Sequence, residues 1–201
     1  KDINNINALA QSGDPKDLFA FKISYNTPTA AITGVKPLYN GNISETHWRS
    51  ATDDNKRSYK YQYDALNRLT KANYEKSYGY TLPNTTQLED YTEGPIGYDK
   101  NGNILSLQRY GLKGSNIIDK IDNLSYLPEP FSNRLQRVTD AGPIDGFNNG
   151  GTGSQMDYEY DDNGNMTTDY NKKIGTVQDN KTRYNHLNLP TRLVIDSNTS
   201  I

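Results

Sequence analysis

The feature that most constrains this chain is a short motif that recurs along it. In each copy an aromatic residue precedes a polar turn rich in Asp, Asn and Gly, and an aliphatic residue follows the turn. The clearest copies are residues 63–69, 98–104 and 160–166. Partial copies are centred on Gly41, Asn133 and Asn188. The six turn centres are 24 to 35 residues apart, which suits a unit of two strands with insertions in its connecting loops.

The aromatic residues of the motif are spaced to form ladders on strands. Tyr61 and Tyr63 are two residues apart, as are Tyr158 and Tyr160, and residues so spaced share one face of a strand. We expect these rings to pack against the next repeat and to hold the sheet together. The corresponding place in other copies is taken by Tyr39, Tyr98 and Tyr184.

The polar part of the motif has the chemistry of a tight hairpin turn. A short carboxylate that opens a turn can accept backbone N–H groups, and this position holds Asp64, Asp99 and Asp161. Gly102 and Gly164 suit the positive φ angle of such a turn. Asparagine is the non-glycine residue best tolerated there, so we expect the same conformation at Asn67, Asn133 and Asn188. The next strand then begins, as at Arg68.

The rest of the sequence favours strands over helices, and it indicates a thin core. The best helical candidate is the short segment 4–11, whereas residues 19–25 alternate as a strand. Residues 78–97 and 142–154 have the composition of polar insertions. Hydrophobic residues make up only 33% of the chain, but 16 Tyr supply further apolar area and the net charge is only −2. We therefore predict a folded, all-β protein.

Composition excludes several classes of protein. The chain has no cysteine, so it has no disulfide framework, zinc ribbon or thiol nucleophile. No apolar run approaches the length of about 18 residues that a membrane-spanning helix needs. The sequence pI of about 5.7, with charges of both signs, removes the general electrostatic argument for binding nucleic acid. We expect neither a nucleic-acid partner nor membrane insertion.

Two polar loops resemble ligand sites only superficially. The turn at 161–165 has its glycine in the fourth position and lacks the glutamate that completes a helix-flanked calcium loop. The glycine-rich stretch 150–153 lacks the lysine of a phosphate-binding loop. We interpret the first as a capped turn and the second as a mobile loop, and expect no metal and no cofactor.

No group of residues points to catalysis. His47 and His186 are far apart in sequence, and we expect both at the surface or in turns. The chain has no Gly-x-Ser-x-Gly motif, which would mark a nucleophilic serine. The carboxylate pairs at 53–54 and 89–90 lie in polar loops, where nothing suggests the burial that raises a pKa for acid catalysis. We expect a protein that is not an enzyme.

The repeated motif resembles the YD repeats of the Rhs (rearrangement hotspot) family. The pattern Tyr-Asp-x-x-Gly/Asn-Arg/Asn-Leu/Ile is close in three copies and partial in three. The resemblance implies about six YD-like repeats over residues 37–201, with residues 1–36 as a lead-in β segment of the same region. Members of the family build antiparallel hairpins into a curved, spiralling sheet that forms a hollow shell. In polymorphic toxins, the shell encloses a C-terminal toxic domain.

One departure from the family's pattern is informative. The shell of many members ends in an Asp-Pro-x-Gly motif, where self-cleavage releases the toxin. In this chain the only Asp-Pro is Asp14-Pro15, and Lys16 follows it. About six repeats give roughly a dozen strands, too few to close a wide shell, and open sheet edges invite further pairing. We therefore expect an open segment of a longer shell.

The resemblance implies a structural role. We expect a non-enzymatic part of a β-shell that encapsulates or carries a C-terminal effector domain of an exported, secreted or cell-surface bacterial protein. Its partners would be the remaining repeats, the effector domain and the secretion machinery. The alternative is a cell-surface adhesion or carbohydrate-binding module that uses the tyrosine ladders to bind a glycan.

Overall fold

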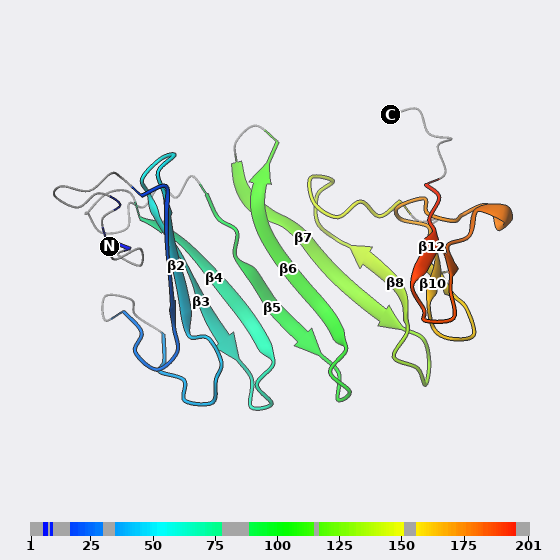
Figure 1. Cartoon of the computed structure of the whole chain (residues 1–201), viewed down its shortest axis with the longest axis horizontal. Coiled ribbons are helices and arrows are strands. Elements are labelled where there is room, and N and C mark those ends of the chain that lie inside the picture. Colours follow the sequence, from blue (N-terminus) through cyan, green and yellow to red (C-terminus); the bar gives the residue numbers. More distant parts are fainter. Residues whose placement is uncertain are drawn as a thin grey trace. The chain divides into compact units, whose positions relative to one another are not determined.

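The computed structural model is all-β, as predicted, and describes residues 6–7, 9, 17–29, 35–77, 89–114, 117–150 and 156–195 (Figure 1). These residues contain twelve strands and one short 3₁₀ helix, η1 (Gln178–Asn180). In the described part of the chain, no helix is long and apolar enough to cross a membrane. Of the predicted helical segment 4–11, the structure describes only residues 6, 7 and 9.

Eight strands form one antiparallel sheet in the order of the sequence, which is the order expected of successive hairpins. They are β1 (Phe19–Ser24), β2 (Glu45–Ser50), β3 (Lys56–Tyr63), β4 (Leu69–Ser77), β5 (Glu93–Tyr98), β6 (Ile104–Lys113), β7 (Ile117–Pro128) and β8 (Leu135–Asp140). Within the described residues β1 and β8 end this order and do not pair with each other, so the sheet is not closed.

Two small sheets follow, each a single antiparallel hairpin. The first pairs β9 (Tyr158–Tyr160) with β10 (Met166–Asp169), and the second pairs β11 (Arg183–Tyr184) with β12 (Pro190–Arg192). By their internal contacts, the residues form two compact units. The first unit is Lys1–Gly97 with Leu107–Ile121, and the second is Tyr98–Ser106 with Asp122–Ile201.

Aromatic side chains pack against one another on one face of the first unit. Trp48 of β2 stacks on Tyr59 of β3, with 5.6 Å between the ring centroids, and Tyr61 stacks on Tyr59 at 6.1 Å. Tyr74 of β4 meets Tyr59 edge to face at 5.5 Å and is only 4% exposed. Such pairs stabilise a sheet beyond the area that they bury.

The sequence prediction succeeds for one segment of this unit and fails for another. Residues 19–24 form β1, as the alternation predicts. The predicted insertion 78–97 is partly wrong, because all of β5 except Tyr98 lies within it and Glu93 pairs with Ala72 of β4. Gly94 allows this pairing, since a Cβ atom there would lie 2.7 Å from the carbonyl oxygen of Thr70. Gly94 thus permits a close approach of two backbones within a segment whose composition predicted a loop.

The interior is thin and polar. The buried apolar residues of the described chain are Ile6, Leu9, Ala20, Ala72, Tyr74, Leu124 and Val138. More polar than apolar residues are buried there, including Asp157 of the second unit. Asp157, directly before β9, links that strand to β8, because its carboxylate accepts the N–H of Val138 and its backbone N–H donates to the carbonyl of Gln136. The buried carboxylate of Asp157 is therefore satisfied by the backbone, as the burial of a charged group requires.

Candidate functional site: the turns and tyrosines of the repeats

The aspartate of the motif caps its own hairpin turn. In the first unit, one carboxylate oxygen of Asp64 accepts the backbone N–H groups of Leu66 and Arg68, both at 2.9 Å. Its second oxygen accepts Nε–H of Arg68 at 2.7 Å. Hydrogen bonds from the Arg68 backbone and side chain hold the pKa of Asp64 below its usual value. The carboxylate is thus engaged by the turn that follows it.

The second unit repeats this arrangement twice. One oxygen of Asp99 accepts the backbone N–H groups of Asn101 and Asn103, and its other oxygen accepts the side-chain amide of Asn103, all at 2.8 Å. Asp161 bonds in the same way to Asn165, at 2.8 Å and 2.9 Å. In both cases the side-chain amide is the main reason that the pKa of the aspartate is lowered.

The last turn shows that an amide can replace the carboxylate. The side-chain oxygen of Asn185 accepts the backbone N–H groups of Leu187 at 2.9 Å and Leu189 at 3.1 Å. The turn closes through the N–H of Asn185, which donates to the carbonyl of Leu189. Sequence reasoning included Asn185 in the last copy of the motif but did not assign it the capping position, although it follows Tyr184 directly, as Asp161 follows Tyr160.

The positive φ angles lie where predicted in four turns and on another residue in a fifth, and the turn at Gly41, for which no φ was predicted, also has one. Gly41, Gly102 and Gly164 have φ between 83° and 93°, and Asn67 and Asn188 have φ of 63° and 58°.

The prediction for Asn133 is wrong, because the positive φ of the fourth turn falls on Phe131, at 59°. This turn is one residue longer, since the N–H of Glu129 donates to the carbonyl of Arg134, five residues on. Pro130 then precedes the residue with positive φ, a combination typical of a type II turn.

Tyrosine hydroxyl groups of the motif reach back to the preceding hairpin. Tyr63 donates to the carbonyl of Ile43 at 3.0 Å, and Tyr160 donates to that of Leu135 at 2.8 Å. Tyr184 donates to the carbonyl of Met166 at 2.7 Å. Leu135 and Met166 are the first residues of β8 and β10, and Ile43 lies two residues before β2, so each acceptor is near the start of the strand that follows the preceding turn. The tyrosine therefore fixes one hairpin against the previous one.

The other predicted tyrosines differ in their surroundings. The hydroxyl groups of Tyr61 and Thr46 lie 3.1 Å apart, and Tyr98 and Tyr158 are half-buried. Burial raises the pKa of Tyr158. Tyr39 is 82% exposed, so its ring does not pack within the sheet.

The predicted asparagines join neighbouring turns. The side-chain oxygen of Asn67 accepts the amide of Asn40 at 2.6 Å and that of Asn42 at 3.3 Å. In the second unit Asn133 accepts the amide of Asn103, and Asn188 accepts that of Asn165, both at 3.0 Å. Asn133 also accepts the amide of Asn101 at 3.4 Å.

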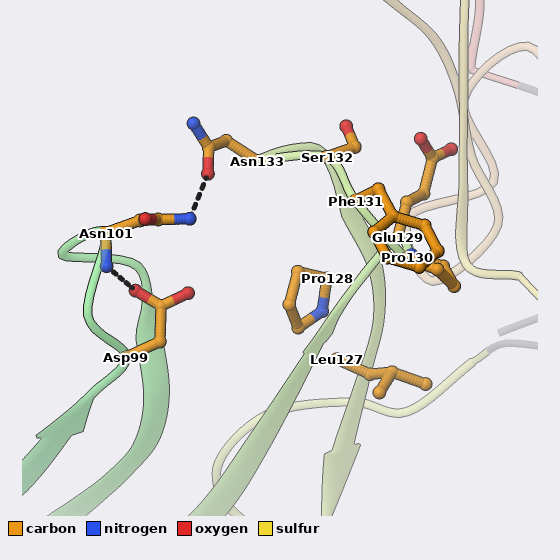
Figure 2. A pocket seen from close by; sticks show the side chains of 9 residues that line it. All are labelled: Asp99, Asn101, Leu127, Pro128, Glu129, Pro130, Phe131, Ser132 and Asn133. Carbon is orange, nitrogen blue, oxygen red and sulfur yellow. Dashed lines mark hydrogen bonds between the residues drawn. The ribbon is translucent and has the colours of Figure 1, made fainter.

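One of these junctions borders an open groove of about 610 Å³ in the second unit (Figure 2). One wall carries Asp99 and Asn101, and the other is formed by residues 127–133, where Asn133 faces Asn101. The ring of Phe131 is fully exposed. The groove has no nucleophile paired with a base, and Asp99 is bonded to its own turn.

One predicted surface residue is instead buried in the first unit. His47 lies in β2 with an exposed fraction of 0%, so its placement at the surface or in a turn was wrong. Its Nε2 atom lies 2.9 Å from Oε1 of Glu45, which is also 0% exposed. The same oxygen accepts the backbone N–H and the hydroxyl of Thr29, at 2.7 Å and 2.8 Å. These contacts hold the segment before β2 against the sheet.

The buried pair has a defined charge state. Burial raises the pKa of Glu45, but hydrogen bonds from His47 and Thr29 outweigh it and hold that pKa below its usual value. Burial lowers the pKa of His47 despite the opposing effect of Glu45, so the imidazole is neutral at pH 7. His186 lies exposed in the last turn, as predicted.

Other titratable groups of the first unit form ion pairs. Asp53 pairs with Arg57, and the hydrogen bond from this arginine is the main reason that the pKa of Asp53 is lowered. Glu89 pairs with Lys76 and accepts the hydroxyl of Tyr74 at 2.8 Å. In the described ranges, no three His, Cys, Asp or Glu side chains are grouped as metal ligands would be.

No protein-family model, curated protein or solved structure matches the chain. Its function is therefore inferred from its own residues.

Proposed function

We propose that this chain is a structural, non-enzymatic segment of an Rhs/YD-repeat β-shell. Such a shell encapsulates or carries a C-terminal effector domain of an exported or cell-surface protein. The partners are then the remaining repeats, the effector and the secretion machinery. The shell, the effector and the location are inferred from the resemblance of the repeats to that family.

The observation that carries the structural role is the use of the motif's polar groups inside the fold. Asp64, Asp99 and Asp161 are bonded to their own turns. The hydroxyl groups of Tyr63 and Tyr160 are bonded to backbone carbonyls. A catalytic group must instead reach a substrate and be held by a base or an orienting partner. The recurring residues therefore serve the hairpins that contain them.

Exposed apolar side chains support the part of the proposal in which the remaining repeats cover the sheet. In the first unit, Phe19, Phe21 and Ile23 point to one face of β1 and are each at least 40% exposed. In the second unit, Leu193 and Ile195 follow β12 and are more than half exposed. An edge strand with exposed apolar residues favours pairing with another strand.

Sedimentation velocity of the purified chain over a range of concentrations tests this proposal. We expect the chain to associate, and the double variant Phe19→Lys/Phe21→Lys to associate less, because the charges oppose pairing at β1. Tyr39→Lys is the matched control, since Tyr39 is exposed but lies outside β1. A chain that stays monomeric at every concentration would contradict the proposal.

The alternative, a glycan-binding module, has a specific observation in its favour. Tyr91 is 45% exposed at the end of the aromatic cluster and meets Tyr74 edge to face at 5.2 Å. Against this, the hydroxyl of Tyr59 already donates to the carbonyl of Tyr91. Glycan-array binding that Tyr91→Ala abolishes and Tyr39→Ala leaves intact would favour the module over the shell segment.

A further inference from the structure

We propose that the asparagines of successive turns form a directional recognition pair. A turn with asparagine directly after glycine donates its side-chain amide, and the next turn along the chain accepts it with an asparagine oxygen. This rule states which kind of hairpin fits beside which. It concerns contacts between neighbouring hairpins and does not depend on the existence of a shell.

An aspartate fixes the direction of the bond in the second unit. The amide of Asn103 donates to Oδ2 of Asp99 at 2.8 Å, and an ionised carboxylate can only accept. The nitrogen of Asn103, and not its oxygen, must therefore face Asp99. The other N–H of the same group lies 3.0 Å from the side-chain oxygen of Asn133. One amide group thus connects the cap of its own turn to the following turn.

The same arrangement occurs a second time in this unit. The amide of Asn165 donates to Oδ2 of Asp161 at 2.9 Å and to the side-chain oxygen of Asn188 at 3.0 Å. The hydrogen bonds that lower the pKa of Asp161 keep it ionised at neutral pH. The direction of this bond is therefore fixed by the same cause.

The first unit reaches the same direction by a different route. Its donor turn has Asn40 and Asn42 on either side of Gly41 and no aspartate cap. The backbone N–H of Asn42 donates to the side-chain oxygen of Asn40 at 3.1 Å, which leaves the nitrogen of Asn40 to face Asn67. The three donor turns thus precede three acceptor turns.

The two kinds of turn alternate along the sequence. Donor turns are centred on Gly41, Gly102 and Gly164, which are 61 and 62 residues apart. An acceptor turn follows each, centred on Asn67, Asn133 and Asn188, in which arginine or leucine follows the asparagine. The structural period is therefore a pair of hairpins. A hairpin that fits beside a donor turn must present a carboxamide or carboxylate oxygen.

Single asparagine-to-aspartate variants of the full chain, one at the acceptor and one at the donor, test the direction of the bond. Asn133→Asp keeps an acceptor, so we expect its thermal midpoint to lie within about 1 °C of that of the unmodified chain. Asn103→Asp places a carboxylate against both Asp99 and the oxygen of Asn133, so we expect a decrease of about 2–4 °C or more.

Asn163→Asp is the control for an added charge at a turn. Asn163 is exposed, and its backbone N–H donates to Asp161 while its side chain lies outside the bridge to Asn188. We expect it to leave the midpoint unchanged. Equal decreases for Asn103→Asp and Asn133→Asp, or no decrease for either, would overturn the proposal.

A double-mutant cycle covers the case in which Asn103→Asp does not fold. The cycle uses Asn103→Ala, Asn133→Ala and the double variant. Because the first change already removes the bridge, we expect the double variant to lose less than the sum of the two single losses. Strictly additive losses would overturn the proposal.

Discussion

The turn at Asp161 shows how one aspartate can define a repeat. Its carboxylate accepts two backbone N–H groups and the side-chain amide of Asn165, while Tyr160 directly before it donates to the carbonyl of Leu135. The Tyr-Asp pair thus has two functions in adjacent positions. The tyrosine fixes the hairpin to the previous strand, and the aspartate closes the turn that follows.

Removing the cap should loosen the turn. We expect Asp161→Ala to lower the denaturation midpoint and to speed hydrogen exchange at the backbone amides of Asn163 and Asn165, because both lose their acceptor. Asp162→Ala is the matched control, since Asp162 is exposed in the same turn. Unchanged exchange in Asp161→Ala would show that the cap does not hold the turn.

Removing one hydroxyl should weaken the contact between hairpins. Tyr160→Phe keeps the ring but loses the 2.8 Å bond to Leu135, so we expect the free energy of unfolding to fall by about 0.5–1.5 kcal/mol. Urea denaturation measures this loss. Tyr39→Phe, at an exposed ring, should change nothing. Equal stability of both variants would contradict the bridging role of Tyr160.

At the scale of the strands and turns, the repeated residues predicted most of the local structure. Tight turns with an aspartate cap were predictable, because Asp, Asn and Gly act within four residues of one another. The positive φ of Phe131 was not, because an added residue moved that conformation away from Asn133. The strand β5 was not predicted, because the close approach of Gly94 to β4 depends on a contact between residues that are distant in sequence.

The sequence also predicted only part of the candidate site. The sequence placed the aspartates and the tyrosine ladder of Tyr61, but the acceptors of the tyrosine hydroxyl groups are backbone carbonyls, which no side-chain pattern reveals. The burial of His47 was also missed. It lies beside Trp48 in an otherwise polar run, and its enclosure by Glu45, Thr29 and the strands on either side of β2 appears only in the fold.

Two buried titratable groups of β2, His47 and Glu45, should make the stability of the first unit depend on pH. The pKa of His47 is lowered from 6.5 in the folded chain, so the unfolded chain binds a proton first and stability falls as the pH drops below 6.5. The pKa of Glu45 is also lowered, so its contribution is lost as the pH falls further. Lys22 and Lys56 face this pair from β1 and β3 and oppose a charge on His47, and Arg49 lies two residues further along β2.

Urea midpoints between pH 7 and pH 5 measure this dependence. We expect the midpoint to fall with the pH, and His47→Gln to remove most of the decrease, because glutamine does not titrate. His186→Gln is the control at an exposed histidine and should keep the slope. An unchanged slope in His47→Gln would show that another group is responsible.

At the scale of the whole molecule, hydrogen bonds supply much of the stability that a larger apolar core would provide. The buried residues of the described chain are mostly polar, and aspartates such as Asp157 bond to the backbone of neighbouring strands. Apolar side chains stay exposed on β1 in one unit and after β12 in the other. This distribution is expected of repeats that complete their cores against neighbouring repeats.

The intact mass of the native polypeptide, with its terminal sequences, tests the central proposal most directly. We expect a mass far above 22.6 kDa, with further Tyr-Asp turns and a distinct domain after the repeats. A native mass near 22.6 kDa would contradict the shell segment and would identify a small repeat protein that acts alone.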